Sequence, residues 1–355
     1  MTDNPAVTKG AETQPATGAT AAAPPSGAGV VSIPRVAVVV VGVLLLQLAF
    51  IGSYLGGLHR PTPRQVPFAV VGTAQAVAPV RQQLQRFGDE VAVRSVPNRA
   101  EAERQIRDRV IYGAYVPDPA GRTDVLLVAS AASAAIERIA TDAAAFARPP
   151  GRTLQVVDVV PLLDSDPQGL SGFYLVVGWV VGGYLLASLL GILRGPRPRS
   201  GRLLAARAAT LVGYALVAGI LSAVFVGPWT HILDRSVPSL AVLGFLVVLG
   251  TAVTTAALEA LFGVFGIGLA ILLFVVLGNP SSGGPYAPEL LPGFWRTIGG
   301  YLPPGAGTAA VSDVVYFGGQ GLTRPLLVLG AYVVVGGLVF AAAGSIRSRP
   351  GHDLA

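Results

Sequence analysis

The side chains that most often carry chemistry are scarce in this chain, and their spacing argues against most catalytic sites. There is no cysteine, which excludes disulfides, thiolate metal sites and cysteine nucleophiles. His59, His231 and His352 lie too far apart in sequence to predict a local metal site. Lys9 is the only lysine, and it lies in an Ala/Thr/Pro-rich tail rather than a P-loop. We therefore expect no metal, no cofactor and no ATP hydrolysis by the chain itself.

The remaining candidate catalytic groups have simpler interpretations. Ser281 and Ser282 have no histidine nearby in sequence, and the chain has no H-E-x-x-H motif. Asp164 and Asp166 precede an apolar run, where a polar turn at a membrane surface accounts for them. Glu259 is the one ionisable residue inside a long apolar run, so an ion-driven carrier, which places such residues within the bilayer, is not favoured. We predict that the chain is not an enzyme.

The composition is that of an integral membrane protein. Of the 355 residues, 52% are hydrophobic and 12% are charged, and the mean hydropathy is +0.62. The formal charge of +6 comes almost entirely from arginine. These arginines cluster beside apolar runs, so their location predicts membrane topology, and nucleic acid is not predicted as a partner.

Apolar runs predict six membrane crossings. The run over 36–58 is long enough to cross ~30 Å of hydrocarbon at ~1.5 Å per residue. The run over 239–277 would extend ~58 Å, so it must form two crossings, with Glu259 marking the turn between them. The other crossings are predicted over 172–193, 208–226 and 325–346.

The arginines predict which side each loop occupies. By the positive-inside rule, the basic loop over 194–207 and the end of the last helix at Arg347 and Arg349 are cytoplasmic. The predicted organisation begins with a disordered cytoplasmic tail over 1–34, transmembrane helix one over 35–58 and an extracytoplasmic α/β domain over 59–170. Transmembrane helices two to six follow over 171–347, with an outer loop over 278–324, and a cytoplasmic tail over 348–355 ends the chain. Both termini are thus expected in the cytoplasm, with the chain in the cytoplasmic membrane.

The polar segment between the first two spans alternates as a small α/β domain does. Five runs predict strands, over 66–72, 91–96, 111–117, 124–129 and 154–160. Asn98 with Glu101 predicts a capped helix start, and the charges from Arg99 to Arg109 predict a solvated helix face. A further helix is predicted through Val77, Val80, Leu84 and Phe87.

The segment before the last span is rich in proline and glycine and predicts repeated turns. From Pro288 onward, apolar residues recur at a helical spacing, which predicts a short amphipathic helix at a membrane surface with Trp295 and Tyr301 as interfacial anchors. The LPPGAG that follows is expected to stop it. The alternative is a plain outer loop. The residues predicted to form this outer re-entrant segment are Pro280, Ser281, Ser282, Gly283, Gly284, Pro288, Glu289, Pro292, Trp295, Tyr301 and Pro303.

These residues carry a resemblance. PSSGG, then PELLP with FW, then LPPGA, together with the PLLDSDPQGLSGFYLVVG entry into the second span, resemble type-2 ABC transporter permeases, particularly the branch containing the YhgE/Pip (phage infection protein) family. The resemblance implies an exporter permease with a membrane α-helical fold of six transmembrane helices. It implies short outer helices before the last span, a separate ATP-binding cassette ATPase, and a homodimer or a pair with a similar permease. No N-terminal amphipathic connecting helix is evident, which departs from many members.

The resemblance also suggests how an ATPase would couple to the chain. A short helix from about Gly201 is expected to resemble the family's coupling helix. Its predicted docking residues are Arg194, Arg197, Arg199, Arg202, Leu203, Leu204 and Arg207. The alternative is that these arginines only fix topology and contact anionic membrane lipid.

Small residues in the second span predict close helix packing, at Gly178, Gly182, Gly183, Ala187 and Gly191. The pattern does not distinguish an interface between subunits from packing within one chain. For the whole protein, the predicted function is an exporter permease subunit. The alternative is a non-transporting membrane scaffold or surface receptor that uses the α/β domain to bind a partner.

Overall fold

The computed structural model describes residues 33–73, 75, 77–78, 82, 90–147 and 151–345 of the chain. The predicted tails therefore lie outside the described residues, except that Ile33 and Pro34 belong to the first helix, α1 (Ile33–Leu58). Most of the helix predicted around 77–87 also lies outside them. The chain divides into two units at Leu45: the first includes the beginning of α1, and all the other elements belong to the second.

Five helices in the described part of the chain are long and apolar enough to cross a membrane. They are α1, α5 (Ser171–Arg194), α6 (Gly201–Val224), which continues as the π-helical stretch η2 (Phe225–Trp229), α7 (Val237–Phe262) and α11 (Thr323–Ser345). These helices and the small sheet described below confirm a mainly helical membrane protein with an α/β domain.

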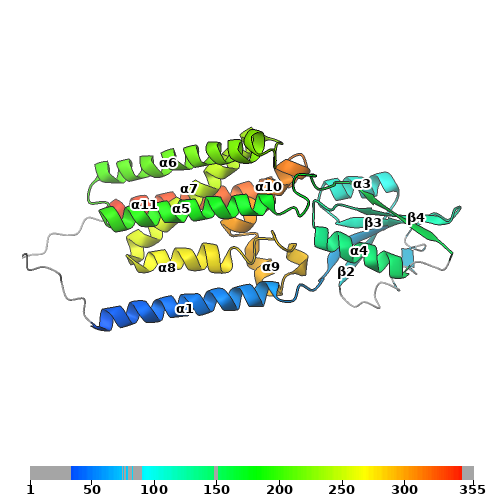
Figure 1. Cartoon of the computed structure of the whole chain (residues 1–355), viewed down its shortest axis with the longest axis horizontal. Coiled ribbons are helices and arrows are strands. Elements are labelled where there is room, and N and C mark those ends of the chain that lie inside the picture. The colour runs from blue at the N-terminus through cyan, green and yellow to red at the C-terminus, as the bar shows by residue number, and fades with distance from the viewer. Residues whose placement is uncertain are drawn as a thin grey trace, which may run out of the picture. The chain divides into compact units, whose positions relative to one another are not determined.

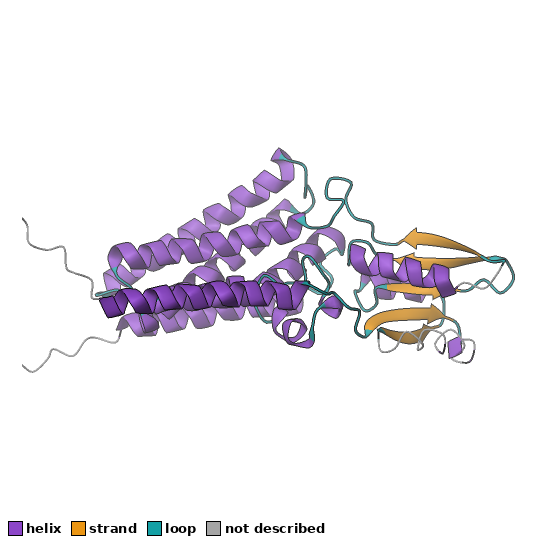
Figure 2. Ribbon diagram, turned by 60° about the horizontal axis from the view of Figure 1, so that its bottom comes forward, coloured by secondary structure: helices purple, strands orange, loops and turns teal. Residues whose placement is uncertain are grey.

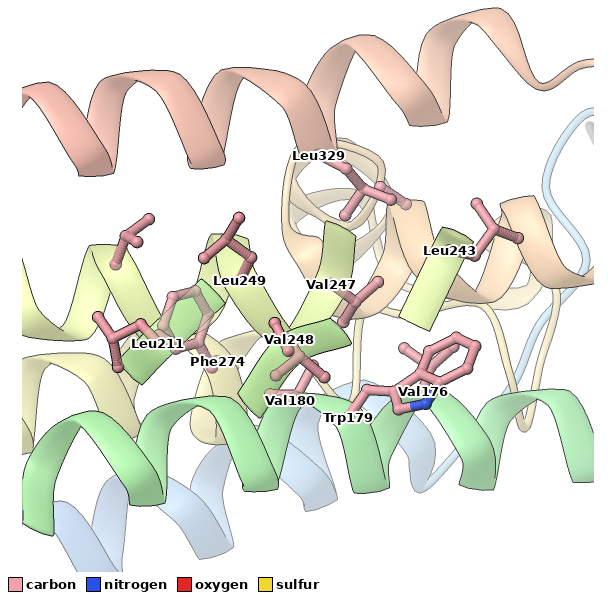
Figure 3. Packing of buried hydrophobic residues seen from close by; sticks show 14 of the residues in the cluster. Val176, Trp179, Val180, Leu211, Leu243, Val247, Val248, Leu249, Phe274 and Leu329 are labelled. Atoms are coloured by element: carbon pink, nitrogen blue, oxygen red, sulfur yellow. The ribbon is translucent and has the colours of Figure 1, made fainter. Parts of the chain in front are cut away.

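Helix α7 is the centre of the helical bundle. It packs against α5, α6 and α11, which run alongside one another in Figure 1. Glycines on its neighbours allow the close approach: a Cβ at Gly183 would lie 2.6 Å from the Val248 carbonyl oxygen, and a Cβ at Gly219 would lie 2.5 Å from that of Ala241. Apolar side chains from these helices fill the space around α7 (Figure 3).

The predicted hairpin over 239–277 is present, but its turn and its second arm differ from the prediction. The turn lies at Gly263, where φ is +62°, and not at Glu259, which is still within α7. The second arm consists of α8 (Phe265–Ile271) and the π-helical stretch η3 (Leu272–Leu277). Its 13 residues rise only ~20 Å, so this arm is shorter than a full crossing.

One further helix prediction needs correction, and another is incomplete. The helix predicted from about Ala208 begins earlier, at Gly201, because the Ser200 side chain caps it by accepting a hydrogen bond from the Leu203 N–H. No separate coupling helix therefore precedes it. The LPPGAG sequence does not simply end a helix: Pro303 and Pro304 begin α10 (Pro303–Tyr316). Proline suits the first helical turn, where an N–H has no partner in the helix.

Most of the predicted outer loop over 278–324 is therefore folded. The amphipathic helix expected from Pro288 is divided into a 3-10 turn, η4 (Pro288–Leu290), and α9 (Gly293–Gly299). Pro292 has extended backbone between them, which interrupts the helix. Helix α10 packs against α5, α7 and α11, and most of its residues are buried.

All five predicted strands are present in the α/β module, which we define as residues 61–169. They are β1 (Val66–Val71), β2 (Val91–Val96), β3 (Gly113–Val116), β4 (Thr123–Val128) and β5 (Thr153–Asp158). The sheet order is β2-β1-β3-β4-β5, and only the β3–β4 pair is antiparallel. Figure 2 shows the strands of this sheet as arrows. Helices α3 (Arg99–Arg107) and α4 (Ala134–Ala147) pack on the sheet. The Asn98 side chain caps α3 through the Glu101 N–H, as predicted.

Candidate functional site

A cleft of about 430 Å³ lies where the α/β module meets the helical bundle. The module contributes the turn after α3 and the loops that precede α4 and α5. The bundle contributes the segment 281–288, α9, one flank of α10 and the beginning of α11. The charged residues on its walls are Asp108, Arg109, Arg296, Asp313 and Arg324. We call this site the junction cleft.

One wall of the junction cleft is non-helical backbone from the PSSGG sequence. Ser281 and Ser282 are buried, and each hydroxyl donates to a backbone carbonyl three or four residues earlier. A Cβ at Gly299 would collide with the Ser281 carbonyl oxygen, so glycine is needed for α9 to pack here. The serines therefore stabilise a buried turn, which is why they need no catalytic explanation.

Arg109 and Asp313 form an ion pair that joins the module to α10. Arg109 follows the C-cap of α3, where its N–H bonds the Ile106 carbonyl and the Val110 N–H bonds the Gln105 carbonyl. This Schellman arrangement usually places glycine at the left-handed position. Here Arg109 has a φ of +58°, which is strained for a residue with a side chain.

The Arg109 side chain explains why glycine is absent from that position. Its guanidinium reaches the Asp313 carboxylate, which is only 2% exposed, and its Cζ lies 4.9 Å from the centre of the Phe317 ring. A buried carboxylate without a partner is strongly unfavourable. The strained backbone of Arg109 thus holds a charge at the one place where it neutralises Asp313.

Other polar contacts also join the module to the bundle. Tyr112 donates its hydroxyl to Glu289 at 2.5 Å. Burial raises the pKa of Tyr112 well above its usual value, and the Glu289 charge raises it further, so this hydroxyl stays protonated as a donor. Arg64 donates its N–H to the Glu289 carbonyl, and Tyr316 donates its hydroxyl to Asp166. Glu289 therefore contacts the module rather than the cleft.

The two aromatic residues predicted as interfacial anchors have different environments. Trp295 is half-buried against α1: its indole N–H donates to the Ser53 hydroxyl, and a Cβ at Gly57 would lie 3.2 Å from the ring. Tyr301 lies after α9, is 60% exposed, and stacks under the Arg324 guanidinium. Their role as interfacial anchors stays a prediction.

Arg207 does not lie on a docking surface as predicted, because it is buried with Glu259. Their side chains are 4% and 2% exposed and form a 2.9 Å ion pair between α6 and α7. Arg207 also donates to the carbonyls of Ala187, Gly195 and Pro196. It thereby satisfies carbonyl groups around the end of α5. The pair explains why both charges occur beside apolar runs.

The other predicted coupling residues have separate roles. Arg197 donates to the carbonyls of Ala260 and Leu261 at the end of α7, and Leu204 packs close to Gly344 of α11. Leu203 is 49% exposed. Arg194, Arg197, Arg199 and Arg202 are all exposed at this end of the bundle, although Arg197 is tied to α7 by its hydrogen bonds. Any docking surface is therefore smaller than predicted.

The small residues of α5 pack within the chain. Gly183 lies against Thr251 and Val248 of α7, and a Cβ at Gly191 would collide with the Glu259 carboxylate. Ala187, which lies between Gly183 and Gly191 in the sequence, is fully buried. Gly182 approaches the Tyr214 hydroxyl of α6, whereas a Cβ at Gly178 would have nothing within 4 Å. Gly182, Gly183 and Gly191 therefore pack against other helices of the same chain.

The sequence did not predict the Arg109–Asp313 pair, which joins residues 204 positions apart. The signal in the sequence was Arg109 itself, an arginine at the position after α3 where glycine is usual. That position can be recognised only once the backbone conformation is known.

No group of three or more His, Asp or Glu side chains that could hold a metal is found among the described residues.

Comparison with family models, curated proteins and solved structures finds no match to this chain. The resemblance to type-2 permeases therefore stays a prediction, and the site must be interpreted from its own geometry.

Proposed function

We propose that this chain is the membrane permease subunit of an exporter energised by a separate ATPase, with the junction cleft as the outer end of the transport path. The observation that supports this is the wall of the cleft. Non-helical backbone over 278–287, buried over 278–282 and half-buried over 283–286, connects the short arm α8–η3 to the short helices α9 and α10. Within a membrane, such backbone is tolerated only where it is enclosed by protein or lines a watery cavity. Broken helices beside a cavity are common in transporters.

The proposed topology places the α/β module outside the cytoplasm and both termini inside. The exposed Arg194, Arg199 and Arg202 favour a cytoplasmic location for the loop between α5 and α6. The sixth crossing would be α8–η3, with the segment 278–287 completing its path. We also propose that the chain forms a dimer, either with a second copy of itself or with a similar permease.

The first test asks whether the junction cleft changes when ATP is used. The chain has no cysteine, so Ser312→Cys would introduce a single thiol on a cleft residue. The matched control is Ser95→Cys, on an exposed position of β2 outside the cleft. We expect a membrane-impermeant maleimide to label Cys at position 312 at a rate that changes when ATP is added to the complex with its ATPase. The rate at position 95 should stay constant.

The outcomes separate the two functions. If an ATPase co-purifies and ATP changes the labelling of the cleft, the permease proposal is supported. If no ATPase associates with the chain in native membranes and the labelling rate is insensitive to ATP, the permease proposal fails. A static scaffold or receptor would then be favoured.

The second test concerns where the ATPase binds. Leu203→Ser removes the exposed apolar side chain at the start of α6 and leaves every charge in place. We expect normal membrane insertion and thermal stability with reduced ATPase co-purification. Leu204→Ser is the contrasting variant, because Leu204 packs inside the bundle and its loss should lower thermal stability. Unchanged co-purification of Leu203→Ser would contradict docking at this position.

A further inference from the structure

The junction cleft has more positive than negative charge on its walls. Three arginines and two aspartates line it. Arg109 and Asp313 neutralise each other in their ion pair, and Asp108 is exposed at the end of α3. Arg296 and Arg324 form no ion pair with any of the described residues. Two guanidinium groups therefore face one exposed carboxylate, which leaves the cleft with a net charge of about +1.

Both guanidinium groups are held in place without using most of their donors. Arg296 on α9 donates from Nη1 to the Arg64 carbonyl oxygen at 3.0 Å. Arg324 at the start of α11 stacks on the Tyr301 ring, with its Cζ 5.0 Å from the ring centre. Arg324 also lies over Gly300, where a Cβ would be 3.2 Å from its Nη2. A guanidinium carries five N–H donors, so most remain available to a ligand.

The rest of the lining limits what the ligand can be. Most lining residues are glycine, alanine or serine, and Leu162 is the only large apolar side chain among the described ones. No aromatic residue lines the cleft in the described part of the chain. An apolar cargo would find little surface to pack against, and a base or sugar ring would find no aromatic face. The guanidinium fork, in contrast, matches the oxygens of a phosphate.

We propose that the junction cleft binds a phosphate group through Arg296 and Arg324. The volume of about 430 Å³ is within the range of small-molecule sites, so it admits a phosphorylated small molecule or a phospholipid headgroup as well as the phosphate itself. This inference rests on the proposed function only in treating the bound molecule as cargo. Phosphate binding requires no ATPase and can be measured on the chain alone.

The test uses the full chain in phosphatidylcholine nanodiscs, with sn-glycerol 3-phosphate as the soluble probe in calorimetric titrations. The test variant is Arg296→Gln with Arg324→Gln. The matched control is Arg94→Gln with Arg138→Gln, which removes two exposed arginines from β2 and α4, outside the cleft. We expect saturable binding by the wild type and the control, and binding weaker by at least about tenfold in the test variant.

A second arm distinguishes a lipid headgroup from a soluble phosphate. Nanodiscs containing about one-fifth phosphatidylglycerol are extracted, and the lipid retained by the protein is counted by native mass spectrometry. The lipid headgroup is identified as the ligand if the wild type and the control retain phosphatidylglycerol, the Arg296/Arg324 variant does not, and the wild type does not bind glycerol 3-phosphate. Equal behaviour of the wild type and the Arg296/Arg324 variant in both arms would overturn the proposal.

Folding controls keep the result interpretable. Arg324→Gln alone changes an exposed residue, so it should fold even if the double variant does not. Arg296→Lys with Arg324→Lys keeps both charges and loses the planar forks, so it should bind more weakly than the wild type and better than the Gln pair.

If phosphate binds but ATP never alters the cleft, the exporter proposal fails while the phosphate site remains. If ATP alters the cleft but neither probe binds, the phosphate site fails instead.

Discussion

Arg109 combines an unfavourable backbone conformation with a favourable side-chain contact, and Arg109→Gly separates the two. Its φ of +58° costs about 1 kcal/mol for a residue with a side chain, and glycine avoids most of that cost. The same replacement removes the guanidinium that pairs with Asp313 and stacks on Phe317. The net effect on stability therefore depends on which contribution is larger.

The side-chain contribution is expected to be the larger one. Removing one partner of a fully buried ion pair costs about 3–5 kcal/mol. Arg109 is 28% exposed while Asp313 is 2% exposed, so water screens this pair and we take a loss of about 2 kcal/mol. The cation–π contact with Phe317 adds about 0.5 kcal/mol. Arg109→Gly should thus destabilise the contact between the module and α10 by about 1–2 kcal/mol.

A second substitution changes the sign of the effect. Asp313→Asn removes the buried charge that Arg109 neutralises, so the ion-pair loss no longer occurs in that background. Arg109→Gly should then stabilise the protein by about 0.5 kcal/mol, because the backbone gain of about 1 kcal/mol exceeds the loss of the Phe317 contact. The assays are thermal unfolding in detergent and hydrogen exchange at the amides around 313–319. If Arg109→Gly has the same sign in both backgrounds, or stabilises the wild type, our explanation of the strained residue is wrong.

Two further predictions concern the bundle and the sheet. Gly191→Ala should lower the melting temperature because the added methyl group collides with the Glu259 carboxylate, whereas Gly178→Ala, with nothing within 4 Å, should not lower it. In the module, Arg152 lowers the pKa of Asp124 to about 2, so the pair stabilises the sheet above pH about 4 and that stabilisation is lost as the pH falls towards 2. The protection of the β4 amides, taken as their exchange rate relative to that of an unstructured peptide at the same pH, should therefore fall over this pH range in the wild type and much less in Asp124→Asn. An equal loss of protection in both would contradict this assignment.

Local sequence patterns predicted most of the secondary structure. The five strands follow from runs of alternating or continuous apolar residues, and their bounds differ from the predicted ones by at most two residues. Asn98 and Glu101 predicted the start of α3 because a cap depends on residues only three positions apart. The long spans followed from hydropathy and length alone. Each of these features depends on neighbouring residues and is readable without the rest of the fold.

The errors arose where partners distant in sequence decide the structure. The break predicted at LPPGAG is present between α9 and α10, but the helix that begins at Pro303 was not predicted, because its glycines fit against neighbouring segments that the sequence does not reveal. Arg207 was expected at the surface because arginines usually are, and its partner Glu259 lies 52 residues away. The junction cleft itself combines segments from 108 to 325, so no single stretch of sequence could predict it.

Two of the buried ion pairs lie near opposite ends of α5 and differ in what can reach them. The Arg207–Glu259 pair lies at the C-terminal end of α5, beside Gly191, and both of its side chains are almost inaccessible to water. Asp313 lies on the cleft wall near the N-terminal end, where Gly172 contacts Val311 of the same helix, α10, and its partner Arg109 is partly exposed. Burying a charge pair seldom adds net stability over apolar packing, so its value lies in fixing which elements meet. A ligand in the junction cleft can compete for Arg109, whereas no ligand reaches Arg207 without the helices separating. Binding events at the cleft are therefore expected to act first on the contact between the module and α10.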